Sequence, residues 1–350
     1  MAKGLCSLIF VARWQTVEAT VRDRVEALLE FYRPLGIAGV ELARLPRLSL
    51  LAGEVRFGSP AGRSPATGRP AWSETDDAFL LWGGPVPAWL NRDRLLAADD
   101  VDLRGLDRTI AGFAADPARA RLVAGCAGAA TLFTARSPAA EAWSSHAVAA
   151  GYIAHGSVSI DPATLPEFFA AEFVGADRTH LRDVAAVPAA TDIAIDERGA
   201  SARSYWPARE RFARIPESEA PAAAEAALLE SLASRLDAPL GGIELGLTAG
   251  ADSRVAAVAL RELGIEFAPV TFAPGLDAPD AQGAGRVAKA LGISHRLYRY
   301  QFTDDADAVS LIDADARWTE GLAPLTGLGV PEAGQPALFV TGAGGETARA

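Results

Sequence analysis

The sequence of 350 residues is poor in lysine, cysteine and long apolar runs. Its only lysines are Lys3 and Lys289, so few positions could supply a catalytic ammonium group. Cys6 and Cys126 are too few for a disulfide framework, and they form no metal-binding spacing. No uninterrupted apolar run reaches about 18 residues, which argues against a membrane-spanning helix.

Positive charge is also in short supply, because the formal net charge is −11. Nucleic-acid backbones and anionic membranes attract basic surfaces, so we expect neither as the main partner. Residues 1–14 hold one lysine and an apolar run that is too short for a secretory signal. A cytoplasmic enzyme is therefore the expected class of protein.

The length favours about two domains, and half of the residues are hydrophobic, which is enough for a packed core. Residues 1–207 predict mainly antiparallel sheet with some helix. A turn-rich segment at 58–77 and a helix within 163–175 belong to this part. Its short β-rich or mixed pieces are CSLIFVAR (6–13), GVELARL (39–45), AFLLWGG (78–84), ATLFTAR (130–136) and HAVAAGYIAHG (146–156).

The pattern changes after a predicted linker at 208–221. A helix follows, with Leu228, Leu229, Leu232 and Leu236 on one face, and Pro239 ends it. Strands and helices then alternate, which is typical of a parallel sheet with right-handed crossovers. The predicted strands are 243–247, 267–272, 294–302 and 336–342, and the helices between them are 254–263 and 280–291.

The corner between the strand at 243–247 and the next helix is small and polar, Thr-Ala-Gly-Ala-Asp-Ser. A helix N-terminus after a parallel strand favours anions, and small residues let a phosphate approach the backbone. Thr248 and Ser253 add hydroxyl donors, whereas Asp252 next to phosphate is best explained by a bridging Mg²⁺. The alternative is a turn that Asp252 and Ser253 merely cap. Neither the Walker pattern nor the dinucleotide-binding pattern is present here.

Three motifs in order resemble those of the asparagine synthase-like family. LTAGADS (247–253) resembles its Ser-Gly-Gly-x-Asp-Ser pyrophosphate loop, and TFAPGLDAPDAQGAGRVAKALGISH (271–295) resembles its second strand and helix. ALFVTGAGGE (337–346) resembles its Leu-Ser-Gly-x-Gly-x-Asp-Glu loop. The likeness extends more weakly to 156–195 and to the Ser-Tyr-Trp at 204–206, which resemble the end of the family's amidotransferase-like domain.

The resemblance implies two domains. Residues 1–207 would form an α+β, Ntn-hydrolase-like domain of antiparallel sheets with helices, a degenerate class II glutamine amidotransferase-like domain. Residues 218–350 would form an α/β parallel-sheet domain of the adenine nucleotide α-hydrolase-like, pyrophosphate-loop type. The implied activity is that of a ligase that adenylates a carboxylate with ATP, releases pyrophosphate and passes the acyl group to a nitrogen nucleophile, as in asparagine biosynthesis.

The implied cofactors are ATP and Mg²⁺. ATP would lie with its pyrophosphate over the first loop and its adenosine moiety against the neighbouring strand ends. The implied nucleotide-binding residues are Leu247, Thr248, Ala249, Gly250, Asp252, Ser253, Pro274, Thr341 and Gly342. Asp252 and Glu346 correspond to the family's magnesium ligands, although a helix N-terminal acid is the simpler alternative for Glu346.

The chain departs from the family pattern at several positions. Thr248-Ala249 replaces Ser-Gly, and Ala343 replaces a glutamate that assists the chemistry in the family. Cys6 could serve as an N-terminal nucleophile only if the five residues before it were removed, so a structural role is preferred. Asn91 is the only asparagine, and Arg92 follows it where an oxyanion site would need glycine.

Glutamine hydrolysis in cis is therefore not expected. The family also continues well beyond the position of Ala350, into a segment with a catalytic lysine, so we expect this sequence to be incomplete. Within the family, His295 would pack or hydrogen-bond on the nucleotide side. No catalytic residue is assigned.

Several functions stay open. Relatives without the cysteine include β-lactam synthetase and the lasso-peptide cyclases, so the substrates would be a small-molecule or peptide carboxylate and an amine or ammonia. A pyrophosphate-loop enzyme that modifies tRNA is a second reading, disfavoured by the acidic charge. A catalytically inactive nucleotide-binding protein is a third. A homodimer is compatible with each of them.

Overall fold

The computed structural model describes most of the chain in nine segments. They are residues 6–57, 78–82, 90–105, 111–125, 131–171, 174–206, 215–236, 242–299 and 338–340. The described residues belong to two compact units, the first ending at Trp206 and the second beginning at Ile215. Each unit is described by itself.

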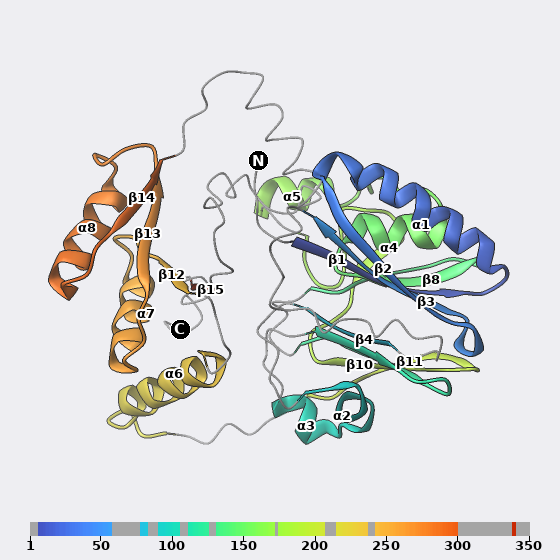
Figure 1. Ribbon diagram of the computed structural model, residues 1–350, viewed down its shortest axis with the longest axis horizontal. Helices are drawn as coiled ribbons and strands as arrows, with labels where there is room; N and C mark the ends of the chain where they lie inside the picture. Colours follow the sequence, from blue (N-terminus) through green and yellow to red (C-terminus); the bar gives the residue numbers. More distant parts are fainter. Residues whose placement is uncertain are drawn as a thin grey trace. The chain divides into compact units, whose positions relative to one another are not determined.

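Two antiparallel sheets form the centre of the first unit (Figure 1). The six-stranded sheet has the order β2 (Ile37–Leu45), β3 (Leu50–Phe57), β1 (Cys6–Trp14), β8 (Ala140–Ser144), β7 (Phe133–Arg136) and β9 (Val184–Ala186). The five-stranded sheet has the order β11 (Gly199–Ser204), β10 (Thr191–Asp196), β6 (Ala120–Val123), β5 (Ala111–Ala115) and β4 (Ala78–Trp82).

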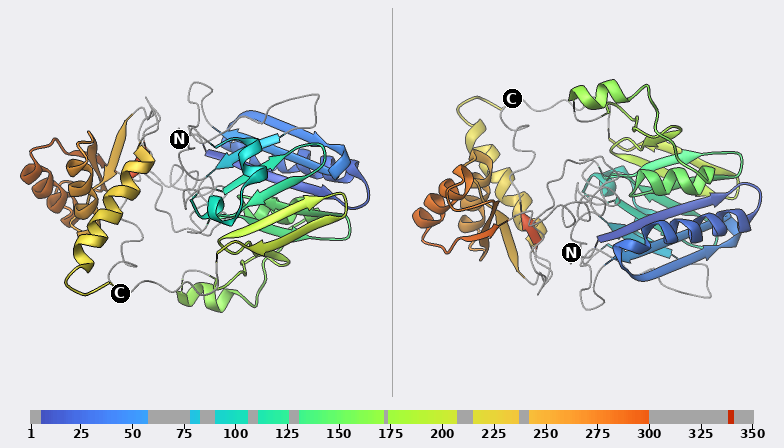
Figure 2. Two further views of the ribbon diagram at one scale, coloured as in Figure 1. Left: turned by 90° about the horizontal axis from the view of Figure 1, so that it is seen from below. Right: turned by 90° about the horizontal axis from the view of Figure 1, so that it is seen from above.

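Helices cover the outer faces of both sheets, so the unit has the layer order helix, sheet, sheet, helix (Figures 1 and 2). The helices α1 (Glu18–Tyr32) and α4 (Ala147–His155) pack on the six-stranded sheet, and α2 (Arg92–Ala97) and α3 (Asp100–Gly105) pack on the five-stranded one. Side chains of both sheets fill the space between them, among them Ile9, Val11, Phe113, Leu122 and Trp143. The remaining short helices are η1 (Arg33–Leu35), η2 (Pro46–Leu48) and α5 (Leu165–Ala171).

The helix α1 shows how the sequence selects one of these layers. Val21, Val25, Leu28 and Tyr32 recur at helical spacing and are buried, while most of the residues between them are exposed. This stripe packs on the sheet near Phe10 and Phe57 in a single apolar cluster. Burial of that stripe, rather than local propensity, therefore fixes the helix on the sheet.

The expected antiparallel sheets with helices are confirmed for the first unit. Four of the five short pieces form strands, namely β1, β2, β4 and β7. The fifth, at 146–156, is instead the helix α4, which ends at Gly156 in the left-handed conformation. The prediction of a β-rich or mixed segment there is wrong, because α4 is buried on nearly all sides and shows no polar face.

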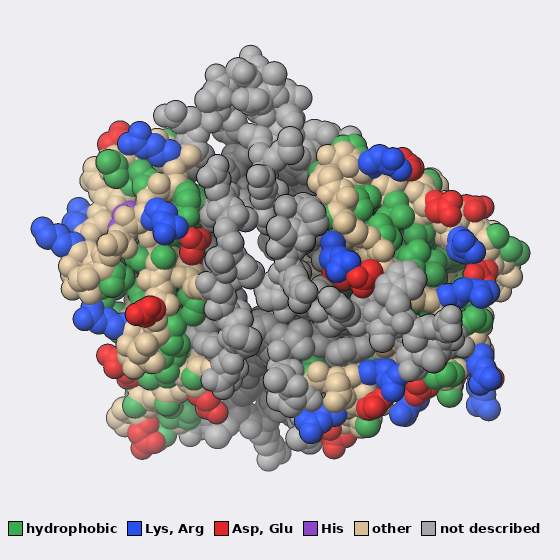
Figure 3. Space-filling view, in the orientation of Figure 1, with side chains coloured by type: hydrophobic (Ala, Val, Ile, Leu, Met, Phe, Trp, Pro, Cys, Tyr) green, Lys and Arg blue, Asp and Glu red, His purple; other side chains and the backbone are tan. Residues whose placement is uncertain are grey.

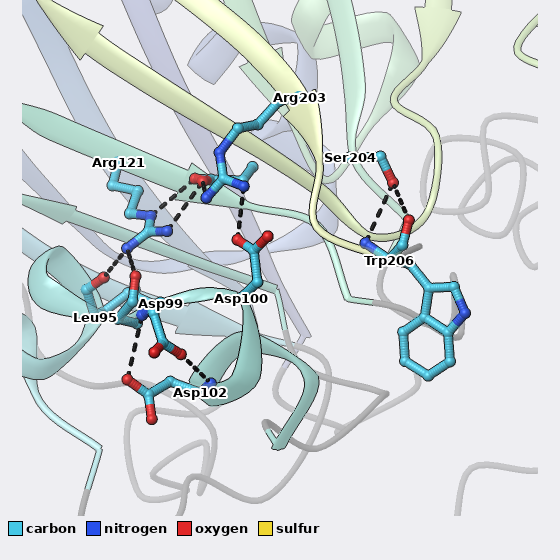
Figure 4. A network of polar contacts seen from close by, with 10 residues as sticks. Leu95, Asp99, Asp100, Asp102, Arg121, Arg203, Ser204 and Trp206 are labelled. Carbon is cyan, nitrogen blue, oxygen red and sulfur yellow. Dashed lines mark hydrogen bonds and ion pairs between the residues drawn. The ribbon is translucent and has the colours of Figure 1, made fainter. Parts of the chain in front are cut away.

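An ion network, buried at Arg121 and Asp192, fastens α2 and α3 to the five-stranded sheet (Figure 4). Arg121 forms two hydrogen bonds with the Asp192 carboxylate, at 2.8 and 2.9 Å, and it also donates to the carbonyl groups of Leu95 and Ala98. Arg203 pairs with Asp192 at 2.7 Å and with Asp100 at 2.6 Å. These charged groups pair with one another, which indicates a structural role for them.

The second unit contains a four-stranded parallel sheet with the order β14, β13, β12, β15. Along the chain its elements are α6 (Ala220–Leu236), β12 (Ile243–Gly246), α7 (Ala251–Glu262), β13 (Ala268–Ala273), α8 (Pro279–Leu291), β14 (Arg296–Arg299) and β15 (Leu338–Val340). The predicted alternation of strands and helices is confirmed, with shifts of one to three residues at most of the described ends. The expected turn at 58–77 lies outside the described residues.

Two successive crossovers in the same direction place α7 and α8 on one face of this sheet (Figure 2). Leu245, Leu247, Leu260, Ala284 and Ala288 form the buried core between the sheet and these helices. Helix α8 stops at Gly292, which adopts the left-handed conformation that glycine tolerates best.

The described surface shows no region of one charge sign on the face drawn in Figure 3. Basic and acidic side chains are interspersed over the first unit there. Within the described residues, no helix has the length and apolar character needed to cross a membrane.

Candidate functional site

The order of the parallel strands marks one edge of the second unit as a candidate site. From β12 the chain steps to β13 and then to β14, whereas β15 pairs with the opposite side of β12. Ligands of open parallel sheets bind beyond the carboxyl ends of the strands where the winding reverses in this way. The reversal lies between β12 and β15, which carry two of the three predicted motifs.

The register brings the ends of these two strands together. Leu245 of β12 pairs with Val340 of β15, so the loop after Gly246 begins beside the last described residue of β15. The predicted residues Thr341, Gly342 and Glu346, and also Ala343, lie outside the described residues. Their assignments stay predictions.

The loop after β12 is held by its own hydroxyl groups. The Ser253 hydroxyl is buried and lies 3.2 Å from both the amide nitrogen and the hydroxyl oxygen of Thr248. Thr248 Oγ1 in turn accepts the amide hydrogen of Gly250 at 3.0 Å. These bonds fix the shape of the loop, and the assignment of both hydroxyl groups to phosphate stays a prediction.

The start of α7 offers anion-binding groups. Gly250 occupies the N-cap position with φ −65° and ψ 154°, and it has no side chain that could bond the first-turn amides. The first turn of α7 therefore begins at a positive helix end that the N-cap residue does not cap with a side chain. Asp252 lies in this first turn and is half-buried.

Helix α8 closes one side of the loop at very short range. A Cβ atom placed on Gly283 would lie 2.4 Å from Cβ of Ala249, so glycine is required where the helix meets the loop. Asp280, in the first turn of α8, accepts the amide hydrogen of Ala249 at 3.4 Å. The sequence analysis did not single out either residue, although both lie within the second motif.

The two residues predicted beside adenosine differ in exposure. Leu247 is fully buried in the core under α7, so only its main chain could reach a ligand. Pro274 directly follows β13 and is exposed. Both lie at the carboxyl ends of neighbouring strands, on the same edge as the loop.

The donor set suits a phosphate more clearly than a metal ion. Among the described residues, no three His, Cys, Asp or Glu side chains cluster as a metal site. Asp252 is the one predicted magnesium ligand that the structure describes, and it lies in the first turn of α7. It fits an ion that is also held by phosphate oxygens and by a second carboxylate.

The first unit provides no comparable group among its described side chains. Cys6 is the first residue of β1, and its side chain lies outside the described part. Asn91 is the N-cap of α2, where its side chain accepts the amide hydrogen of Arg94 at 2.9 Å. The side chain of the chain's only asparagine thus caps a helix.

No protein-family model matches the chain, and no curated protein matches it. Among solved structures, glutamine phosphoribosylpyrophosphate amidotransferase from B. subtilis, complexed with ADP and GMP, is 12% identical. It covers 87% of this chain and 70% of its own, with a TM-score of 0.31. A second, the allosteric regulatory enzyme of purine biosynthesis, is 13% identical and covers 87% of this chain and 69% of its own, with a TM-score of 0.33. Scores this low carry no argument about the fold or the activity.

Proposed function

We propose that the protein is an ATP-dependent, AMP-forming amide synthetase of the asparagine synthase-like type. The observation that carries the proposal is the position of the Thr248–Gly250 loop and the uncapped start of α7 at the reversal point of the parallel sheet. The order of the three sequence motifs supports it.

In the proposed site, the first-turn amides of α7 bind the pyrophosphate part of ATP. Leu247, through its main chain, and Pro274 border the adenosine moiety, as do Thr341 and Gly342. Asp252 and Glu346 hold Mg²⁺, which lowers the charge repulsion between phosphate and carboxylate groups. Ser253 and Thr248 keep the loop in the shape that presents the amides.

The proposed reaction has two steps. A carboxylate oxygen of the substrate attacks the α-phosphorus of ATP, the bond to pyrophosphate breaks, and an acyl-adenylate forms. A nitrogen nucleophile then attacks the acyl carbon, AMP departs, and the nitrogen loses a proton. Release of ammonia from glutamine would need an asparagine in an oxyanion site, and the only asparagine of the chain caps a helix. We therefore propose free ammonia, an amine of the same substrate or a peptide amino group as the nucleophile.

The test is ATP binding and pyrophosphate release with Mg²⁺ and candidate carboxylates. Asp252→Asn removes one charge from the start of α7, and Glu262→Gln makes the same change at the far end of that helix. We expect Asp252→Asn to weaken Mg²⁺-dependent ATP binding by at least about tenfold, or 1.4 kcal/mol, and Glu262→Gln to leave it unchanged.

Two results would speak against the proposal in different ways. If the protein does not bind ATP, or if both variants behave alike, the nucleotide site is wrong. If ATP binds but no carboxylate promotes pyrophosphate release, the inactive nucleotide-binding alternative is favoured over an enzyme.

A further inference from the structure

A chain of hydrogen bonds reaches the candidate loop from the two neighbouring strands. Thr271, in the middle of β13, is 2% exposed, and its hydroxyl donates to the Leu247 carbonyl at 2.6 Å. His295, directly before β14, lies with Nε2 at 2.8 Å from the same hydroxyl oxygen. Segments of three neighbouring strands, β12, β13 and β14, are thereby connected.

The direction of each bond follows from the number of hydrogens. A hydroxyl has one hydrogen, and a carbonyl oxygen can only accept, so Thr271 donates to Leu247. Thr271 must then accept from His295, whose Nε2 therefore carries the hydrogen in this network. Burial lowers the pKa of His295, which favours the neutral ring with this single N–H.

The carbonyl that Thr271 binds belongs to the peptide group between Leu247 and Thr248. The amide hydrogen of that same peptide group points to the Ser253 hydroxyl, at 3.2 Å between nitrogen and oxygen. Because a peptide group is planar, fixing its carbonyl and its N–H fixes its orientation. The amide of Leu247 is also bound, to the Val270 carbonyl at 2.8 Å.

We infer that Thr271 and His295 are positioning residues that clamp the Leu247–Thr248 peptide and so set where the loop and the start of α7 present their donors. This inference rests on the proposed function for its effect on ATP, but the clamp itself is a property of the unliganded protein. Neither side chain is assigned a contact with the nucleotide.

Two pairs of variants distinguish the loss of a hydrogen bond from a change in side-chain shape. Thr271→Val keeps the shape and removes the hydroxyl, whereas Thr271→Ser keeps the hydroxyl. His295→Leu removes the donor, whereas His295→Gln offers an amide nitrogen at a similar reach. Thr191→Val is the matched control, because Thr191 is also buried and donates to a main-chain carbonyl, that of Pro188 at 2.6 Å, in the first unit.

Two measurements test the clamp. Without ATP, we expect Thr271→Val to raise the hydrogen-exchange rate of the Thr248 and Gly250 amides by about tenfold, since a buried carbonyl loses its partner. With ATP and Mg²⁺, we expect Thr271→Val to raise the Kd for ATP about 5- to 50-fold, and His295→Leu to raise it less. Thr271→Ser and His295→Gln should restore most of both properties, and Thr191→Val should change neither.

A folded Thr271→Val protein with wild-type amide exchange would overturn the inference. If Thr271→Val does not fold, His295→Leu decides by the same comparison with His295→Gln. If the wild-type protein fails to bind ATP, the proposed function is wrong, and the exchange rates alone then decide whether the clamp exists.

Discussion

The two units begin comparable helices in opposite ways. In the first unit, Asn91 precedes α2 and its side chain takes up the amide hydrogen of Arg94. In the second unit, Gly250 precedes α7 and offers no capping side chain. A capped helix start is satisfied by the protein itself, whereas an uncapped one keeps its positive end available to an anion.

Other polar groups of the two units show the same contrast between structural and binding roles. Arg121, Asp192 and Arg203 satisfy one another behind the five-stranded sheet and stabilise the attachment of two helices. In the second unit, the polar side chains of Thr248 and Ser253 gather at one edge and shape a loop. Charges that satisfy one another indicate a structural role, and uncapped donors beside a fixed loop indicate a binding site.

The largest expected effect comes from breaking the buried network of the first unit. Asp192→Ala leaves Arg121 buried without its carboxylate, which should lower the free energy of unfolding by about 3–5 kcal/mol. Asp100→Ala removes the exposed end of the same network and should cost no more than about 1 kcal/mol. Urea unfolding of both variants measures the difference, and equal losses would mean that burial does not decide the strength of these pairs.

The next effect concerns the contact between α8 and the loop. Gly283→Ala places a methyl group 2.4 Å from Cβ of Ala249, so we expect a loss of about 1–3 kcal/mol and weaker ATP binding. The control is Gly285→Ala on the same helix, where the nearest atom would be His295 Nδ1 at an ordinary 3.9 Å. Thermal unfolding and ATP titration of the pair test this, and a Gly285→Ala protein that is the worse of the two would contradict it.

The next pair of variants removes the side-chain cap of α2 and adds one at the start of α7. Asn91→Ala should lower the free energy of unfolding by about 1 kcal/mol, because α2 loses its N-cap side chain. It should leave ATP binding unchanged, because α2 does not belong to the proposed site. In Gly250→Asn the Cβ atom would lie 3.1 Å from Thr248 Oγ1, a tight contact, and the amide oxygen would compete with phosphate, so we expect weaker ATP binding. If Gly250→Asn binds ATP as the wild type does, the start of α7 is not the anion site.

The smallest effect is a pH dependence in the first unit. Burial raises the pKa of Glu141, and the charges of Arg136 and Arg13 only partly oppose this. A carboxyl group with a raised pKa in the folded state lowers stability once the pH exceeds its unfolded pKa, and this cost is absent at lower pH. Glu141→Gln should therefore gain stability relative to the wild type as the pH rises above about 4, which urea unfolding at several pH values would measure. A difference that does not change with pH would exclude the raised pKa as its cause.

The second unit is the part that could be predicted from sequence in most detail. Its helices α7 and α8 show an apolar periodicity, and a left-handed glycine follows each of them, Gly264 and Gly292, all of which are local signals. The first unit gives weaker signals, because its strands are short and α4 is buried without a polar face. Gly156, the left-handed residue that ends α4, is the signal that could have identified this helix.

Some features of the candidate site could be predicted from the sequence, and others could not. The sequence alone determined that small and hydroxyl-bearing residues follow a predicted strand, that a helix comes next, and that the chain alternates strands with helices. Only the tertiary structure decided that β15 lies beside β12, that Ser253 and Thr248 bind each other, and that Thr271 holds the Leu247 carbonyl. The reason is physical. Periodicity records which face of an element is buried, whereas the partner of a main-chain group at a strand end is supplied by residues far away in the sequence, and no local pattern records it.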